Sequence, residues 1–278
     1  MNAGSTIDWP YPRWIAHRGA GKLAPENTLA AFRRGASCGY TMFECDVKLS
    51  SDGVPFLLHD DTLERTTNST TNNATNNATN NATNGGSMPG SAVTGNSTAA
   101  SHSWTALQKL DAGSWHSAEF SGEPLPSLEQ VAQYCIANGF DLNIEIKPTP
   151  GFEAETGRLV AEHAARLWRG ADRQPLLTSF RPEALEAAQQ AAPDLPRGLL
   201  LHELWTGWLE TALVLGCQAV VCNSRLWDKS SVIQAKSAGF KTLSYTVNDQ
   251  AEVDRVLALG TDGIITDRVD VFDPNRFG

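Results

Sequence analysis

Short apolar runs alternate with longer amphipathic segments along most of this chain. From residue 127 onward the alternation is regular, and Gly239 and Gly260 stand where two helices should end. The apolar residues of each short run are consecutive, which is typical of strands buried on both faces. The predicted strand–helix pairs are 141–146 with 152–168, 175–179 with 182–192, 198–201 with 205–215, 219–222 with 228–238, and 241–245 with 249–259, followed by a last strand at 263–266.

Two further strands precede this series. Residues 14–16 are followed by a predicted helix at 27–38, and residues 42–46 continue into a strand-like extension at 54–59. Eight strands alternating with helices over about 250 residues predict a (β/α)8 barrel, the TIM-barrel fold, as a single domain spanning residues 1–278. An open doubly wound sheet is the alternative, but no Gly-x-Gly-x-x-Gly turn follows the first strand.

Polar side chains that could catalyse a reaction or bind a ligand stand at the ends of the apolar runs. They include two histidines, three carboxylates, an arginine and a lysine, namely His17, Arg18, Glu44, Asp46, His59, Glu145 and Lys147. In a barrel of this kind, the carboxyl ends of the strands form the active face. We therefore expect these side chains to converge at one end of the barrel.

The spacing of the acids indicates a cation. Residues two apart on a strand point to the same face, so Glu44 and Asp46 project together, as do Glu145 and Lys147. Two neighbouring acids repel each other unless a cation or a proton separates them. Oxygen ligands suit Mg²⁺ or Ca²⁺ better than Zn²⁺. With histidines to move protons and cationic side chains to neutralise phosphate, the set indicates metal-assisted phosphoester chemistry.

Composition and charge narrow the class of protein. Hydrophobic residues make up 41% of the chain, enough for a large core, and the net charge of −9 disfavours non-specific binding to nucleic acid or to an anionic membrane. The five cysteines form no Cys-x-x-Cys pair, which favours reduced thiols. The first twelve residues lack the features of a signal peptide, and no apolar run is long enough to span a membrane. We expect a cytoplasmic protein.

Residues 68–100 depart from the rest of the chain. The tetrapeptide Asn-Asn-Ala-Thr occurs three times in succession at 72–83, and the whole stretch contains few large apolar side chains. Such a composition cannot bury enough surface to offset the entropy lost on ordering. The pattern predicts a low-complexity Asn/Thr/Ala loop.

Several ordered motifs resemble those of the glycerophosphodiester phosphodiesterase family, in its short bacterial cytoplasmic type. The resemblance covers about residues 12–270 outside the repeats and implies a TIM barrel with a small insertion after the second strand, here at 60–126. The motifs are His17-Arg18, Pro25-Glu26-Asn27-Thr28, Glu44-x-Asp46, His59-Asp60, Asn143–Lys147, Tyr245–Asn248 and Thr261–Asp267.

The resemblance also implies roles for individual residues. The expected ligands of one divalent cation, Mg²⁺ or Ca²⁺, are Glu44, Asp46 and Glu145; the expected catalytic pair is His17 and His59; Arg18 and Lys147 are expected at the phosphate, with Lys147 alternatively tuning Glu145; and Phe180 and Tyr245 are expected to line a glycerol pocket. The implied reaction on this small-molecule substrate is hydrolysis of a glycerophosphodiester to sn-glycerol 3-phosphate and an alcohol.

Some alternatives stay open at this point. The first attack on phosphorus could come from the glycerol 2-hydroxyl, through a cyclic phosphate, or directly from water, and either histidine could be the acid. A related barrel enzyme could act on lysophospholipids, which would need an exposed apolar rim. A non-catalytic phosphodiester-binding protein would need a missing acid or histidine, and none is missing. The headgroup alcohol and the oligomeric state do not follow from the sequence.

Overall fold

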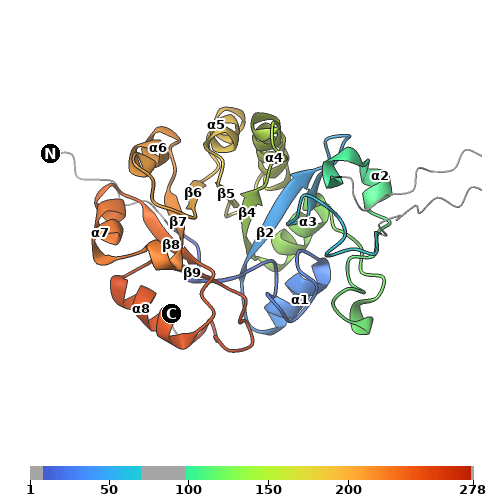
Figure 1. Cartoon of the computed structure of the whole chain (residues 1–278), viewed down its shortest axis with the longest axis horizontal. Helices are drawn as coiled ribbons and strands as arrows, with labels where there is room; N and C mark the ends of the chain where they lie inside the picture. The colour runs from blue at the N-terminus through green and yellow to red at the C-terminus, as the bar shows by residue number, and fades with distance from the viewer. Residues whose placement is uncertain (1–8, 70–97, 277–278) are drawn as a thin grey trace, which may run out of the picture.

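Eight parallel strands close into a barrel in the computed structural model, which describes residues 9–69 and 98–276. Strand β1 pairs with both β9 and β2, and this pairing closes the sheet (Figure 1). The (β/α)8 fold expected from the sequence is therefore confirmed. The strands are β1 (Trp14–Ala16), β2 (Met42–Leu49), β4 (Asp141–Ile146), β5 (Leu176–Ser179), β6 (Arg197–Leu201), β7 (Ala219–Asn223), β8 (Lys241–Tyr245) and β9 (Gly263–Thr266).

Helices surround the barrel, with α4 to α6 along the top of Figure 1 and α1 and α8 along the bottom. The expected helix bounds differ from the observed ones by a few residues, and α3 was not predicted. Up to Arg276, the described chain forms no helix after β9. The described chain therefore has seven barrel helices, rather than eight, between the barrel strands. They are α1 (Leu29–Ser37), α3 (Leu128–Asn138), α4 (Glu153–Leu167), α5 (Pro182–Ala191), α6 (Trp208–Val214), α7 (Lys229–Ser237) and α8 (Gln250–Leu259).

Local sequence signals account for where several helices begin and end. Helix α3 starts with a capping box, in which Ser127 and Gln130 each bond the backbone N–H of the other. Gly239 and Gly260 adopt positive φ, Gly239 two residues after the end of α7 and Gly260 directly after α8, where the sequence predicted the two helices to stop. A left-handed residue costs glycine little, so each ends its helix and turns the chain toward the next strand.

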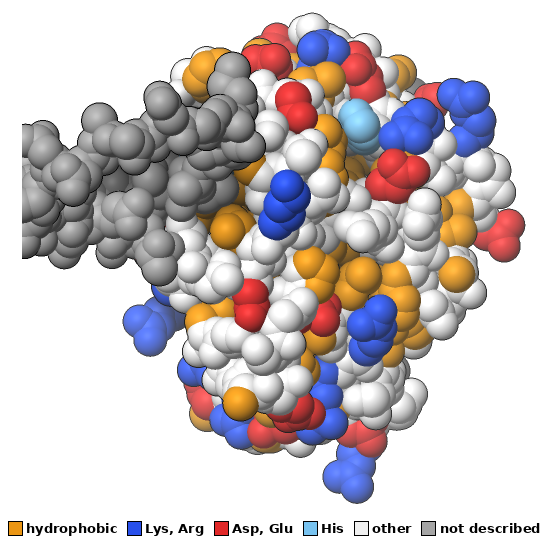
Figure 2. Space-filling model, turned by 90° about the vertical axis from the view of Figure 1, so that its right-hand side faces the viewer, with side chains coloured by type: hydrophobic (Ala, Val, Ile, Leu, Met, Phe, Trp, Pro, Cys, Tyr) orange, Lys and Arg blue, Asp and Glu red, His pale blue; other side chains and the backbone are white. Residues whose placement is uncertain are grey.

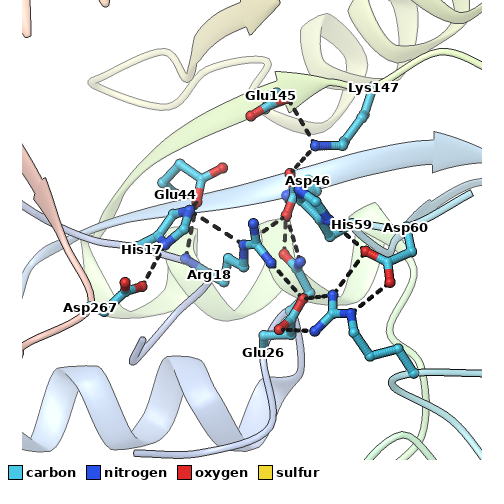
Figure 3. A network of polar contacts seen from close by, with 12 residues as sticks. His17, Arg18, Glu26, Glu44, Asp46, His59, Asp60, Glu145, Lys147 and Asp267 are labelled. Atoms are coloured by element: carbon cyan, nitrogen blue, oxygen red, sulfur yellow. Dashed lines mark hydrogen bonds and ion pairs between the residues drawn. The ribbon is translucent and has the colours of Figure 1, made fainter. Parts of the chain in front are cut away.

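The extension predicted at 54–59 is a separate antiparallel strand. Strand β2 runs three residues beyond Asp46, turns, and returns as β3 (Pro55–Leu57), with Val47 opposite Leu57. The backbone N–H of Leu58 donates to the carbonyl of Asp46 over 3.1 Å. The hairpin therefore brings the following residue, His59, back beside Asp46 (Figure 3).

The segment between β3 and α3 packs on this hairpin. It contains η1 (Ala99–Ser101), α2 (Trp104–Leu107) and η2 (Ala118–Phe120). Its apolar cluster includes Phe56, Leu58, Leu63, Ala99, Leu107, Ala112 and Leu125. Residues 70–97 of the expected low-complexity loop lie outside the described residues. The bounds of the insertion, 60–126, and the single-domain organisation stay predictions.

Three apolar regions hold the barrel together. Two lie between strands and helices, one against α1, α3, α4, α5 and α8 and one against α5, α6 and α7. The third lies inside the barrel, below its polar end, around Ile15, Met42, Leu176 and Leu243. All five cysteines are free thiols. Across residues 9–69 and 98–276, none of the helices has the length and apolar character that a membrane span requires.

Candidate active site

Three buried carboxylates from adjacent strands meet at the carboxyl end of the barrel. Glu44 and Asp46 lie on β2, and Glu145 lies on β4 directly opposite Asp46 in the strand register. One carboxylate oxygen from each of the three lies within 4.8 Å of the others. The alternation of side chains along β2 points Cys45 the other way, into the core between sheet and helices. The structure thus brings together the three acids that the sequence singled out (Figure 3).

Burial makes this concentration of negative charge unfavourable. Burial and the charge of Asp46 raise the pKa of Glu44 and, in the same manner, that of Glu145. Burial alone would also raise the pKa of Asp46, but the charges of Lys147 and Arg18 outweigh it and hold that pKa well below its usual range. Asp46 is therefore the ionised centre of the trio, and its charge adds to the effect of burial in raising the pKa of its two neighbours.

Two cationic side chains flank the acids. The Nζ of Lys147 lies 3.3 Å from Oδ1 of Asp46 and 3.4 Å from Oε1 of Glu145. The Nε of Arg18 lies 3.4 Å from Oδ2 of Asp46, and the backbone N–H of Arg18 donates to Glu44 over 3.0 Å. Arg18 has a φ of 51°, a conformation that a non-glycine residue adopts at a cost. The loop after β1 is thus held in a strained conformation in which the guanidinium and the backbone N–H of Arg18 both point toward the acids.

The two histidines share one arrangement. Nδ1 of His17 donates to Asp267 over 2.6 Å, and Nδ1 of His59 donates to Asp60 over the same distance. A carboxylate at Nδ1 fixes the tautomer and makes Nε2 the acceptor nitrogen, which in His17 accepts a hydrogen bond from Nε of Arg18 over 3.3 Å. Nε2 of His17 lies 3.8 Å from Glu44, and His59 lies beside Asp46 in Figure 3. Burial lowers the pKa of both rings, but the bond to Asp267 and the charge of Glu44 leave the pKa of His17 raised, whereas that of His59 is lowered.

Sequence reasoning assigned no role to the residues that support these groups. Asn27 has a φ of 59°, and its side-chain amide donates to Oδ2 of Asp46 and accepts from the backbone N–H of the same residue. Asn248 donates to Oδ2 of Asp267 and accepts from its backbone N–H. Both asparagines belong to motifs on which the family resemblance rests. Only the resemblance could have marked them, because neither stands at the end of an apolar run.

Phe180 and Tyr245 line the cavity that holds the site. Their rings meet edge to face, with centroids 5.8 Å apart, and the Tyr245 hydroxyl donates to the carbonyl of Leu201. The cavity has a volume of about 160 Å³ and is also lined by His17, Arg18, Glu44, His59, Glu145 and Lys147. A wider cavity of about 390 Å³ adjoins it and shares His59, Glu145, Lys147 and Phe180. Every predicted site residue except the buried Asp46 therefore borders the smaller cavity.

The donor set fits a hard divalent cation. All three acids present oxygen, the element that Mg²⁺ and Ca²⁺ prefer. Oε1 of Glu44 is buried and has no hydrogen-bond partner in the described part of the chain. A buried carboxylate oxygen without a donor is costly, and a cation between the acids would remove that cost.

Known proteins share this chain's sequence and fold. The Glycerophosphoryl diester phosphodiesterase family matches residues 17–271. A glycerophosphodiester phosphodiesterase of Caldanaerobacter subterraneus subsp. tengcongensis is 30% identical, over 91% of this chain and 93% of that protein. A solved structure of an Oleispira antarctica phosphodiesterase, in complex with the product sn-glycerol-3-phosphate, is also 30% identical. It superposes with a TM-score of 0.77 over 92% of this chain and 93% of that chain.

A human glycerophosphoinositol inositolphosphodiesterase is similar over a shorter stretch. It is 35% identical over 157 residues, which is 51% of this chain and 26% of that protein. The match to the family, in contrast, runs from the first histidine of the site to a point beyond Asp267. With that extent and the barrel-end arrangement of its acids and histidines, the chain belongs to the glycerophosphoryl diester phosphodiesterase family.

Proposed function

We propose that this protein hydrolyses glycerophosphodiesters to sn-glycerol 3-phosphate and an alcohol. The observation that carries the proposal is the buried trio of Glu44, Asp46 and Glu145, flanked by two histidines that each have a carboxylate at Nδ1. Membership of the family and the product bound in the Oleispira antarctica relative support the same reaction.

Glu44, Asp46 and Glu145 would hold one divalent cation, Mg²⁺ or Ca²⁺. When bound, such a cation withdraws charge from a phosphoryl oxygen and orients the phosphate. Arg18 and Lys147 border the same cavity and would neutralise the remaining phosphate charge, since each carries donors suited to phosphate oxygens. Asn27 would keep the carboxylate of Asp46 in place through its two hydrogen bonds.

His17 and His59 would transfer the protons. In the route we favour, the glycerol 2-hydroxyl attacks phosphorus while one histidine takes its proton. The other histidine gives a proton to the departing alcohol, which leaves a cyclic phosphate. Water then opens the ring with the two roles exchanged, which restores both histidines. Direct attack by water is the alternative, and it needs no free 2-hydroxyl.

The two adjoining cavities suggest how the substrate lies. The smaller one has an apolar wall of Phe180, Tyr245, Leu200 and Ile265, which suits the carbon chain of a glycerol moiety. The larger one opens beyond His59 and is lined by polar groups of both signs, including Asp61 and Arg181. We assign it to the departing alcohol.

The arrangement of apolar residues argues against a lysophospholipid substrate. Such a substrate needs an apolar surface beside the site for its acyl chain. The large apolar side chains that are exposed in the described chain are Trp115, Ile136, Phe152, Leu213, Val214, Ile233 and Val271, and none of them lines either cavity.

Nucleic acid is not an expected partner. The net charge is −9, and on the face seen in Figure 2 basic and acidic side chains are intermixed rather than gathered by sign. A basic surface is the usual electrostatic requirement for nucleic-acid binding. A cytoplasmic location stays a prediction from the sequence.

The test is an assay of both products. The purified protein should release sn-glycerol 3-phosphate and choline in equal amounts from glycerophosphocholine. An analogue without the 2-hydroxyl should not be cleaved if the cyclic route holds, and should be cleaved if water attacks directly. Folded protein that releases neither product from the choline, ethanolamine, inositol or glycerol diesters would refute the proposed function.

A further inference from the structure

Arg65 joins two carboxylates that come from different loops. It follows β3, in the proposed insertion. Its Nε and Nη2 donate to Asp60 over 2.6 and 2.9 Å. Its Nη1 and Nη2 donate to Glu26, in the loop after β1, over 2.8 and 2.7 Å. Three guanidinium nitrogens are thus used on two carboxylates.

Each of these carboxylates holds a residue of the proposed catalytic set. Oδ1 of Asp60, which accepts from Arg65, also accepts from Nδ1 of His59 over 2.6 Å. Oε1 of Glu26, which accepts from Arg65, also accepts from Nη1 of Arg18 over 2.7 Å. A continuous chain of hydrogen bonds therefore runs from His59 through Arg65 to Arg18. Figure 3 shows Asp60 beside His59 and Glu26 below Arg18.

The geometry excludes a direct role for Arg65 at the phosphate. Each of its three guanidinium nitrogens donates to Asp60 or Glu26, and it lines neither of the two cavities. A planar guanidinium can make paired parallel bonds to carboxylates, whereas the ammonium of lysine is a point charge without that geometry. The bond from Arg65 also lowers the pKa of Asp60 to about 2, which agrees with a fully ionised partner for His59.

We propose that Arg65 is a positioning residue that sets the distance between the proton-transfer group His59 and the phosphate-binding group Arg18. The two groups reside on different loops, one after β3 and one after β1, and Arg65 connects those loops through ionised side chains. This inference rests on the proposed function. It assigns the described start of the insertion a part in catalysis that its sequence alone does not reveal.

Three variants and one control test it. Arg65→Ala removes the bridge, and Arg65→Lys keeps the charge without the paired geometry. Glu26→Gln weakens the half of the bridge that joins Arg65 to Arg18 and leaves the bonds between Arg65 and Asp60 in place. Arg158→Ala is the matched control, since the side chain of Arg158 is similarly exposed and makes two hydrogen bonds to Glu162. Both residues lie on α4, and neither lines the two cavities.

Arg65→Ala should lower kcat by on the order of 10²-fold, the scale of a small misplacement of reacting groups, with a smaller change in KM. Arg65→Lys should recover little of this loss. Guanidinium chloride at non-denaturing concentration should restore part of the activity of Arg65→Ala, relative to sodium chloride at equal ionic strength. The loss in Arg65→Ala combined with Glu26→Gln should be smaller than the product of the single losses. Arg158→Ala should match the wild type.

A readout independent of turnover separates this inference from the proposed function. Arg65→Ala should shift the NMR signals of the His59 imidazole, while those of His163 on α4 stay unchanged. A variant with kcat within twofold of the wild type and unshifted His59 signals would overturn the inference. A loss of kcat that guanidinium does not reverse, together with unshifted His59 signals, would do the same. Wild-type protein that cleaves no diester would instead refute the proposed function, and the His59 signals would still decide the position of Arg65.

Discussion

At the scale of single residues, the two histidines of the site differ in their surroundings. His17 is enclosed by Glu44 and Asp267, whose charges raise its pKa, whereas burial lowers the pKa of the more exposed His59. Both nevertheless have a carboxylate at Nδ1, so in the proposed mechanism each would present Nε2 to the substrate. This pairing is the physical basis for assigning both rings to proton transfer.

Removing either ring should stop efficient turnover. His17→Ala and His59→Ala should each lower kcat by roughly 10²-fold or more, because a positioned acid or base contributes on that scale. Thermal unfolding should show that both variants stay folded. His163→Ala, on the outside of α4, serves as the control. A near-normal kcat in one variant would remove that histidine from the mechanism.

The bond between His17 and Asp267 makes a separate prediction. Asp267→Asn removes the negative charge at Nδ1 and permits the amide to donate, so the wrong tautomer of His17 gains population. We expect kcat to fall by about 10-fold or more, although less than on deletion of the ring. Steady-state kinetics on glycerophosphocholine measure this. An unchanged kcat would show that Asn248 and Asp267 serve the loop rather than the histidine.

Asp141, at the start of β4 and away from the site, predicts a pH dependence of stability. Burial raises its pKa from 3.8 to about 6, although Arg173 lies 2.9 Å away and opposes this. The folded state therefore binds a proton more tightly than the unfolded state. The free energy of unfolding should fall as the pH rises through the interval between those values.

Asp141→Asn lacks this titration. The difference in unfolding free energy, variant minus wild type, should therefore increase by on the order of 2–3 kcal/mol between about pH 4 and pH 7. Chemical denaturation at several pH values measures the difference, and a constant offset from the altered contact with Arg173 does not affect its slope. A difference that does not vary with pH would contradict the assignment.

At the scale of elements, the sequence allowed the barrel to be predicted because its strands are apolar on both faces. The eight barrel strands and the acids at their ends followed from this pattern. Helix α3 was missed, although its buried residues Leu128, Val131, Ala132 and Cys135 follow a helical period after the capping residue Ser127. The antiparallel direction of β3 was also not predicted, since strand direction depends on the pairing of Val47 with Leu57 and not on local composition.

Supporting residues were the least predictable part of the site. Glu26, Arg65 and Asn248 act on groups distant in the sequence, such as the pair formed by Arg65 and Glu26. Their contacts exist only after the barrel closes. A polar residue in a loop carries no periodic signal that distinguishes such a contact from ordinary solvent exposure.

The low-complexity stretch gives a prediction at the same scale. Asn68 is bonded to Asp111, and Ala99 is buried and bonded to Asp61, so these two edges should be kept. Replacing residues 70–97 by a short Gly/Ser linker should change the free energy of unfolding by about 1 kcal/mol, because loop-closure entropy varies with the logarithm of length.

Activity on glycerophosphocholine should also persist in this deletion, since every proposed catalytic residue lies outside 70–97. Denaturant titration and kcat/KM test the two statements separately. A large loss of kcat/KM with normal stability would show that the deleted stretch helps to bind the substrate.

At the scale of the whole molecule, barrel closure creates the site. Loops after β1, β3 and β9 supply His17, His59 and Asp267, while β2 and β4 supply the acids. Residues more than two hundred positions apart, such as His17 and Asp267, meet only because β1 pairs with β9. The proposed site therefore requires the entire barrel, and its acids are proposed to act through a cation.

Metal dependence tests this claim most directly. The protein is stripped by chelation, its metal content is measured, and release of sn-glycerol 3-phosphate from glycerophosphocholine is followed before and after Mg²⁺ or Ca²⁺ is added. We predict that turnover disappears on stripping and returns with a divalent cation, and that Glu145→Gln weakens the cation response. Full activity in protein shown to contain no metal would contradict the account.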